Sequence, residues 1–215
     1  MFATLNEAIT FIRSYLTETE GPPRVFDTSH IILALYYVFN KGPCSRTSLS
    51  AYLNLGEGSI KSMIRIMKNL GLINTTFKGC YLTELGSQII QLFRYYFPLI
   101  VEEVPNLKYV KMGNFNSLIV LRHISISNFI KLRDMFIRKG AEGASILHFQ
   151  NNILSIPLVI EDLSIHSEED YSILHNFPLK NGDFLVICGA DIRQKALIAA
   201  ISGLLSSINL FIHLE

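Results

Sequence analysis

The order of helical and extended patterns between residues 28 and 82 limits the fold of this chain more than any other feature. Apolar residues first recur at the spacing of a helix, then stop at glycine and proline breakers, and finally give way to two short runs typical of strands. The pattern predicts helices at 28–39, 46–53 and 60–70, a tight turn at 56–58, and strands at 72–76 and 80–82. Helix, short helix, turn, helix and a two-stranded ribbon are the elements of a winged helix-turn-helix.

Two further helices are expected to flank this motif. Apolar residues at helical spacing predict them at 5–17 and 84–97, and Pro98 marks the end of the second. We therefore assign residues 1–99 to a winged-helix domain with an extra N-terminal helix.

The charge of this segment favours a polyanionic partner. The whole chain carries a net charge of +1, but residues 28–97 hold seven Lys or Arg and two Asp or Glu, an excess of +5 (7 − 2). In the third helix, basic residues recur at i, i+4 and i+7 and share one face, as reading of the DNA major groove requires. We expect DNA contacts from Arg46, Thr47, Ser59, Lys61, Ser62, Arg65, Lys68 and Lys78.

The outer members of this set have separate roles. Arg46 and Thr47 begin the short helix, where free backbone N–H groups favour a phosphate. Lys78 lies at the tip of the ribbon and should add affinity more than sequence choice. The alternative is a module that makes only protein contacts, because winged helices also serve that purpose.

After Pro98 the pattern changes to strands mixed with helices. We expect strands at 107–112, 117–122, 144–150, 153–157 and 183–188, and helices at 127–139 and 192–207. A GlyAsnPheAsn turn is expected between the first two strands, and AsnAsn at 151–152 joins the next two. Asp191 is a candidate cap of the last helix. These elements predict an α+β two-layer sandwich at 104–215, with its sheet covered on one face, and so a mixed fold for the chain.

No catalytic or metal site emerges from the sequence. Cys44, Cys80 and Cys188 are scattered singly, the six histidines lack metal spacing, and no nucleophile or phosphate-loop motif is present. We therefore expect no enzyme activity, metal or cofactor, and a reducing, cytoplasmic setting. The carboxylates at 161–170 fit a solvated loop better than a cation site. The ligand candidates near a strand-to-helix junction are His148, Cys188, Asp191 and Arg193, although each also has a structural explanation.

Five short motifs give this chain a more specific character. They are LeuGlyGluGlySerIleLys at 55–61, AsnLeuGlyLeuIle at 69–73, LysGlyCysTyrLeuThrGluLeuGly at 78–86, GlyAlaGluGlyAla at 140–144 and CysGlyAlaAsp at 188–191. In combination they resemble an archaeal family of two-domain proteins, in which a winged helix precedes a C-terminal domain of uncharacterised role. The resemblance implies a second domain similar to the GAD domain inserted in some tRNA-handling enzymes. The helix-turn-helix of that family implies a transcription regulator.

These features predict a regulator that binds duplex DNA and whose second domain binds a small-molecule effector or mediates dimerization. A homodimer is expected because one winged helix offers few base contacts, whereas two related by a twofold axis read two half-sites. The alternative is an RNA-handling or enzymatic protein that uses the winged helix for substrate or protein contacts. The uncharged run at 196–212 is expected to be a buried helix rather than a membrane anchor.

Overall fold

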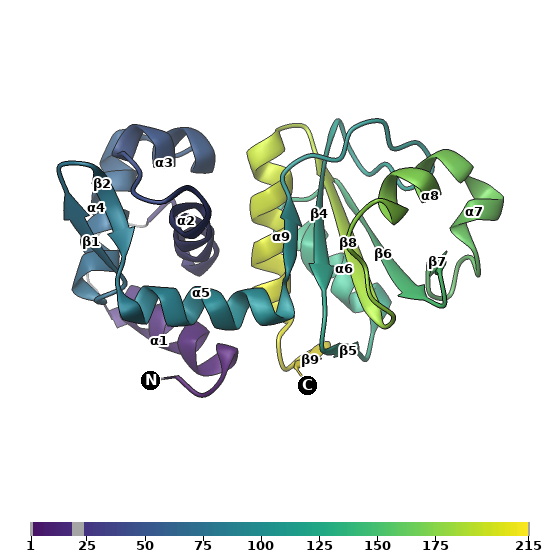
Figure 1. Cartoon of the computed structure of the whole chain (residues 1–215), viewed down its shortest axis with the longest axis horizontal. Helices are drawn as coiled ribbons and strands as arrows, with labels where there is room; N and C mark the ends of the chain where they lie inside the picture. The colour runs from purple at the N-terminus through teal and green to yellow at the C-terminus, as the bar shows by residue number, and fades with distance from the viewer. Residues whose placement is uncertain (1, 19–23, 215) are drawn as a thin grey trace. The chain divides into compact units, whose positions relative to one another are not determined.

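The chain forms two compact units (Figure 1), Met1–Phe93 and Arg94–Glu215. The structure is a computed structural model that describes residues 2–18 and 24–214. It divides the chain earlier than the boundary near residue 99 expected from Pro98. Within the second unit, the Tyr96 carbonyl accepts a hydrogen bond from the Arg122 N–H at 2.9 Å, and strand β3 (Leu99–Val101) pairs with β4 (Phe115–Leu121).

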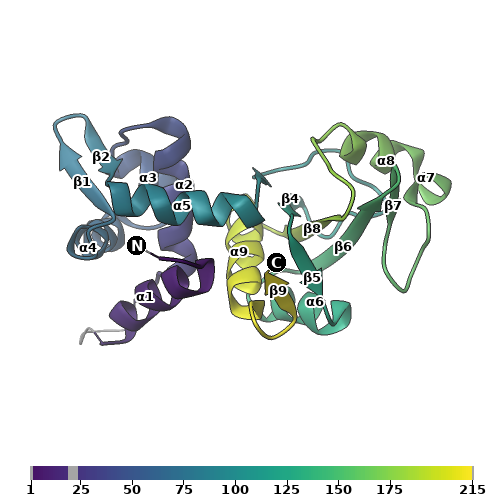
Figure 2. The ribbon, with the colours of Figure 1, turned by 60° about the horizontal axis from the view of Figure 1, so that its bottom comes forward.

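The first unit has the predicted order of elements. They are α1 (Leu5–Glu18), α2 (Thr28–Lys41), α3 (Arg46–Leu53), α4 (Glu57–Asn69), β1 (Ile73–Thr76), β2 (Gly79–Leu82) and α5 (Glu84–Tyr96). Strands β1 and β2 are antiparallel and form a ribbon beside α4 (Figure 2). The winged-helix shape predicted for this half is therefore confirmed.

Helix α2 begins at a strong cap. The Asp27 carboxylate accepts hydrogen bonds from the backbone N–H groups of Ser29 and His30. Burial acts to raise the pKa of this carboxyl, but the hydrogen bonds with His30 and Ser29 outweigh it and hold the pKa well below its usual range. The cap fixes the start of the helix on which the core of this unit packs, since α2 residues 28–35 are all buried.

The second unit is built on a five-stranded antiparallel sheet with the strand order β3-β4-β8-β6-β7. After β3 and β4 its elements are β5 (Ile124–Ile126), α6 (Phe129–Arg138), β6 (Gly143–Gln150), β7 (Ile153–Ser155), α7 (Leu163–His166), α8 (Glu168–His175), β8 (Asp183–Ala190), α9 (Arg193–Ser207) and β9 (Ile212–Leu214). Asn151 and Asn152 join β6 to β7 with φ of 50° and 65°, as predicted for a tight hairpin. The predicted mixed fold is thus confirmed.

This sheet is covered on both faces, whereas we expected a cover on one face only. Helices α6 and α9 lie against one face, where they contact β6, β4 and β8. Leu163 of α7 and Leu174 of α8 join a buried cluster with Leu118 and Leu185 on the other face. The central strands β4 and β8 are buried along almost their whole length, which a cover on one side does not allow.

The segment predicted as a strand at 107–112 is not a strand. It crosses the end of the sheet, and the buried Asp170 carboxylate accepts hydrogen bonds from the N–H groups of Lys108 (2.8 Å) and Val110 (2.9 Å). Leu107 and Val110 of this segment are buried in the cluster with α7 and α8, so their spacing reflects packing rather than strand pairing. The predicted turn at 113–116 therefore does not join two strands: β4 already begins at Phe115.

Two local predictions were wrong at element ends, and two short strands were missed. Glu57 lies in the first turn of α4 rather than in a turn before it, because Gly56 is the N-cap. Asp191 does not cap α9; its N-cap is Ile192, and the Asp191 carboxylate instead pairs with Lys195 at 2.9 Å. The short strands β5 and β9 were missed, and they pair with each other. In the part of the chain that is described, no helix has both the length and the apolar character needed to cross a membrane.

Candidate nucleic-acid interface

The helix-turn-helix of the first unit is held by a small buried core. Ser45 caps α3, because its hydroxyl accepts a hydrogen bond from the N–H of Ser48 (3.0 Å). Asn54 ends α3 in the left-handed conformation with φ of 52°, which turns the chain toward α4. The buried side chains of α3 and α4 are Leu49, Leu53, Ile60, Met63, Ile64, Ile66 and Met67.

The outer face of α4 is basic. Lys61, Arg65 and Lys68 are exposed, at the i, i+4 and i+7 spacing of one helix face. Ser59 and Ser62 are half-buried beside them. The Lys68 ammonium also donates to Thr75 Oγ1 at 3.3 Å, which joins this face to strand β1. The structure thus brings five of the eight predicted contact residues together on one helix.

Arg46 and Thr47 lie in the first turn of α3, and both are exposed. The first N–H groups of this helix lack backbone partners within it, so a phosphate oxygen is a suitable acceptor for them. Arg46 supplies a positive charge at the same end.

Lys78 lies at the tip of the wing, next to a residue that the sequence analysis did not select. Phe77 is 95% exposed at that tip, and the Lys78 ammonium lies 5.7 Å from the centre of its ring. A phenylalanine so exposed is unusual in a turn, and apolar side chains at such positions enter the minor groove in some DNA-binding proteins. The sequence signal that could have identified Phe77 is its position in the turn between the two predicted strands of the ribbon.

The wing is tied, next to its tip, to the residue before the N-cap of α3. Cys44 and Cys80 exchange two backbone hydrogen bonds of 3.0 and 2.8 Å, so β2 pairs with Cys44 on one side and with β1 on the other. A side chain at Gly79 would overlap the Cys44 carbonyl oxygen, at 2.2 Å from the added Cβ, so only glycine allows this approach. This pairing was not foreseen from two cysteines separated in the sequence.

Both thiols are free and buried. Burial raises the pKa of Cys44 to about 11, and the neighbouring Cys80 contributes to this rise. Burial also raises the pKa of Cys80, while the positive charges of Lys68 and Arg46 act in the opposite direction. At neutral pH the pair is therefore protonated and belongs to the packing of the wing rather than to its chemistry.

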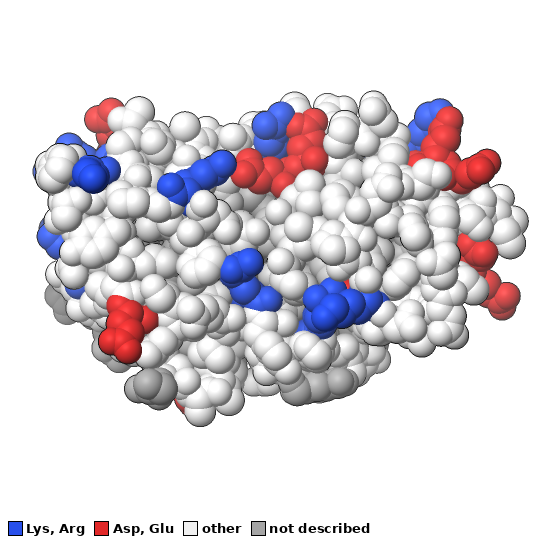
Figure 3. All heavy atoms as spheres, in the orientation of Figure 1, with Lys and Arg blue, Asp and Glu red and all other residues white. Residues whose placement is uncertain are grey.

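The charges of the helix-turn-helix and wing are nearly all of one sign. Within α3, α4, β1, β2 and the wing tip, which are described throughout, Glu57 is the sole acidic residue. Figure 3 shows lysine and arginine side chains along the side of the first unit formed by α4 and the wing, and acidic side chains over α7 and α8 of the second. The first unit therefore presents a basic surface, whereas the short helices of the second do not.

The ligand candidates of the second unit do not form one site. His148 and Cys188 are four ladder positions apart on β6 and β8, since His148 pairs with Phe184 and Cys188 with Ala144. That separation is about 13 Å along the sheet. His148 stacks on the Phe184 ring at 4.7 Å, and burial lowers its pKa. Cys188 is fully buried, and Arg193 pairs with Glu103. Over the described ranges, no three His, Cys, Asp or Glu side chains gather closely enough to hold a metal ion.

Comparison with known proteins finds a family match within the second unit and a similar solved structure. Residues 112–208 match the family described as a domain of unknown function (DUF4443). A solved structure, "Hypothetical protein PH0730 from Pyrococcus horikoshii OT3", is similar with a TM-score of 0.68 and 26% sequence identity. The alignment covers 83% of this chain and 90% of that chain, so it extends over both units. No curated protein sequence matches the chain. The DUF4443 region contains α6 to α9 and the strands β4 to β8.

Proposed function

We propose that the protein is a transcription regulator that binds duplex DNA, with α4 in the major groove and the tip of the wing on the sugar-phosphate backbone. The observation that carries this proposal is the set of exposed cations on α3, α4 and the wing, with Glu57 as the one acid among them. The five cations are Arg46, Lys61, Arg65, Lys68 and Lys78. Surface basicity of this kind in a helix-turn-helix favours a polyanion over a protein partner.

The five cations set the expected salt dependence. Each cation that neutralises a phosphate releases counterions, and the slope of log affinity against log salt is about −0.9 per phosphate on B-DNA. Five contacts per protomer therefore predict a slope of roughly −4.5. If fewer of these cations contact phosphates, the slope of log affinity against log salt should be shallower.

The test is selection of binding sites from a random duplex library, followed by fluorescence anisotropy on the selected site. The double variant Lys61→Ala/Arg65→Ala removes two cations from the face of α4 and should lose the preference for the selected site over a scrambled one. Lys78→Ala should weaken binding to both duplexes alike and make the salt slope about 1 unit shallower. The matched control is Lys139→Ala, which removes an exposed lysine from the second unit and should change neither result.

Two outcomes contradict the proposal. One is a double variant that is folded by circular dichroism and still prefers the selected site. The other is equal or tighter binding to duplex RNA of the same sequence, because the deep, narrow major groove of RNA does not admit a helix. The second outcome supports the RNA-handling alternative, to which the resemblance to a GAD domain also points.

The remaining parts of the proposal concern the state of the protein. We propose that it acts in the cytoplasm as a homodimer, that its second unit takes an effector or mediates dimerization, and that neither unit is catalytic. Light scattering with and without a duplex that carries two half-sites should give the mass of a dimer in the complex. A complex that contains one protomer per two-site duplex contradicts this part while leaving DNA binding intact.

A further inference from the structure

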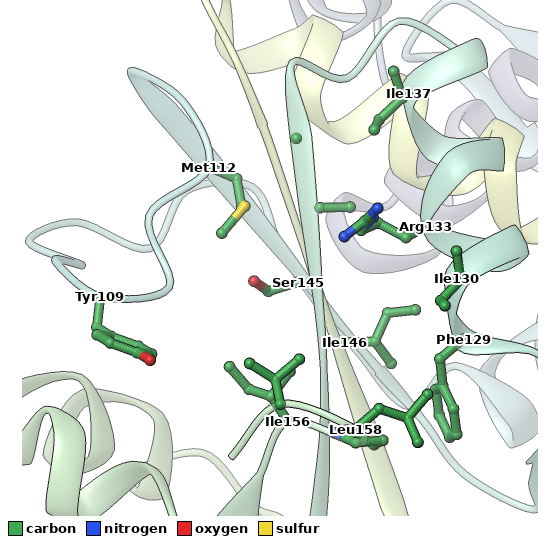
Figure 4. Close-up of a pocket in the computed structure, with 14 residues that line it drawn as sticks. Tyr109, Met112, Phe129, Ile130, Arg133, Ile137, Ser145, Ile146, Ile156 and Leu158 are labelled. Carbon is green, nitrogen blue, oxygen red and sulfur yellow. The ribbon is translucent and has the colours of Figure 1, made fainter.

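The second unit contains a groove along one edge of its sheet. The groove has a volume of about 590 Å³ and lies between α6, the segment that crosses the end of the sheet, and the turn after β7. Figure 4 shows strand β6 running through it, with Met112 and Ser145 on one side and Arg133 and Ile146 on the other. This volume is within the range of binding pockets.

The floor of the groove is an unpaired strand edge. Strand β6 pairs with β8 over residues 143–149, but β7 covers its other edge only at residues 148–150. Nothing in the described ranges pairs with that edge at residues 143–147. Because backbone groups alternate between neighbours, and His148 faces β7, the N–H and C=O groups of Ala144 and Ile146 point toward the groove.

These backbone groups lie deep in the unit. Ala144 and Ile146 are each only 5% exposed, and Ser145 between them is 8% exposed. Buried backbone groups are almost always paired in proteins, so this edge calls for a partner that carries its own donors and acceptors at strand spacing. The Ser145 hydroxyl lines the groove and has no hydrogen-bond partner among the residues that the structure describes.

The walls of the groove are apolar and carry one charge. Phe129, Ile130 and Ile137 of α6 lie on one side of the strand, and Tyr109 and Met112 on the other. Side chains of an added strand point alternately to these two sides. Arg133 is the one charged residue that lines the groove. Its guanidinium reaches from α6 toward β6, with Asp134 as a distant ion partner at 3.7 Å.

The turn at the mouth of the groove is strained. The N–H of Val159 donates to the carbonyl of Ile156 at 2.9 Å, with Pro157 and Leu158 as the two central residues. Leu158 has φ of 68°, where glycine or asparagine is favoured, and its side chain is 84% exposed while it lines the groove. An apolar side chain held at that cost beside an apolar groove points to contact with an occupant.

We propose that this groove binds an extended apolar peptide that carries a carboxylate, as an added strand on β6. The peptide backbone pairs with Ala144 and Ile146, its alternate side chains fill the two walls, and its carboxylate accepts hydrogen bonds from Arg133. The buried edge lies between α6 and the turn, which favours a single extended chain over a strand that is part of a second folded copy.

The test uses the full chain and a fluorescein-labelled peptide, Val-Ala-Val-Ala-Val with a free carboxyl group. Two further peptides carry N-methyl groups on residues 2 and 4 or on residues 3 and 5. Only one of these two sets of N–H groups faces β6, so one methylated peptide should bind at least tenfold more weakly and the other about as well as the parent. On binding of the parent peptide, exchange of the Ala144 and Ile146 amides with solvent should slow.

Variants of the protein test the two ends of the groove. Arg133→Gln should weaken binding of the peptide with a free carboxyl group about fivefold and leave binding of the same peptide with a C-terminal amide unchanged. The control Arg138→Gln, which replaces an exposed arginine of the same helix, should change the affinity for neither peptide. Leu158→Gly should raise or preserve the melting temperature of the free protein and yet weaken binding of the peptide. If the Leu158 side chain served only the stability of the fold, the variant would not lose affinity for the peptide without also losing stability.

Three results overturn the proposal. They are no binding of the parent peptide at millimolar concentration, equal effects of the two methylation patterns, and unchanged exchange of the Ala144 and Ile146 amides in the complex. Equal effects of methylation mean that the groove takes apolar molecules without pairing of the strand.

Discussion

Arg122 and Asp183 form an ion pair whose energetics can be worked out from its surroundings. Arg122 follows β4 and Asp183 begins β8, and the guanidinium donates from Nε at 2.8 Å and from a terminal nitrogen at 2.6 Å to the two carboxylate oxygens. Asp183 is 1% exposed and also accepts from the N–H of Lys180. The hydrogen bond with Asp183 raises the pKa of Arg122, so the guanidinium is charged throughout the range of ordinary assays.

Replacing Arg122 by methionine leaves the buried carboxylate with one backbone donor. Removal of one partner from a buried pair costs about 3–5 kcal/mol, and we expect the lower end because the Lys180 N–H remains. Hydrogen exchange measured by mass spectrometry reports the opening of this sheet without requiring the two units to unfold together. A loss of about 3 kcal/mol should accelerate exchange of residues 115–121 and 183–190 roughly 150-fold.

A second substitution separates the buried charge from the lost contact. Arg122→Met/Asp183→Asn removes the charge while the amide oxygen still accepts from Lys180, so its cost should fall to about 1–2 kcal/mol. Lys108→Met breaks the exposed pair with Glu169 and should change exchange less than about fivefold. A double variant less stable than Arg122→Met would refute the reasoning, because the cost then lies in lost contacts and not in the unpaired charge.

Three further predictions concern the first unit. Asp27→Ala should lower the free energy of unfolding by about 1 kcal/mol at neutral pH. Because the pKa of Asp27 is depressed in the folded protein, this difference should be present above the unfolded pKa near 4 and shrink as the pH falls below it. Denaturation of both proteins across pH measures it. Gly79→Ala should lower the melting temperature of this unit, by a loss of about 1–3 kcal/mol or more, since its φ is +117° and the added Cβ meets the Cys44 carbonyl; an unchanged melting temperature would contradict this. Phe77→Ala should leave the melting temperature unchanged and weaken binding to all DNA duplexes in anisotropy; a variant with full affinity would show that the exposed ring does not touch DNA.

The sequence was most informative where local interactions decide the structure. Helix α3 lies at Arg46–Leu53 as predicted, because Ser45 caps one end and Asn54 ends the other within a few residues. The same holds for the hairpin at Asn151 and Asn152, whose backbone conformation depends on those two residues. For the predicted DNA contacts, spacing along one helix was enough to place three cations on one face.

Prediction failed where distant segments decide the structure. The segment at 107–112 was predicted to be a strand, but Asp170, some sixty residues later, accepts hydrogen bonds from the N–H groups of Lys108 and Val110. Strands β5 and β9 are each three residues long and pair with each other although they are far apart in the sequence. Neither is long enough to show the apolar pattern of a strand in the sequence. The groove was missed for a related reason, since it depends on where β7 leaves the edge of β6.

The attachment of the wing to Cys44 has a consequence for the way DNA would be read. Strand β2 is paired on both sides, and Lys68 of α4 is bonded to Thr75 of β1, so Arg46, α4 and Lys78 keep their spacing without any DNA. A rigid surface of this kind has little freedom to adapt, so a bound duplex would have to bend or twist wherever its straight form does not match the spacing of the cations. The cost of that deformation depends on base sequence, being low at flexible pyrimidine–purine steps. The preferred sites should therefore share mechanical properties at base pairs that no side chain touches.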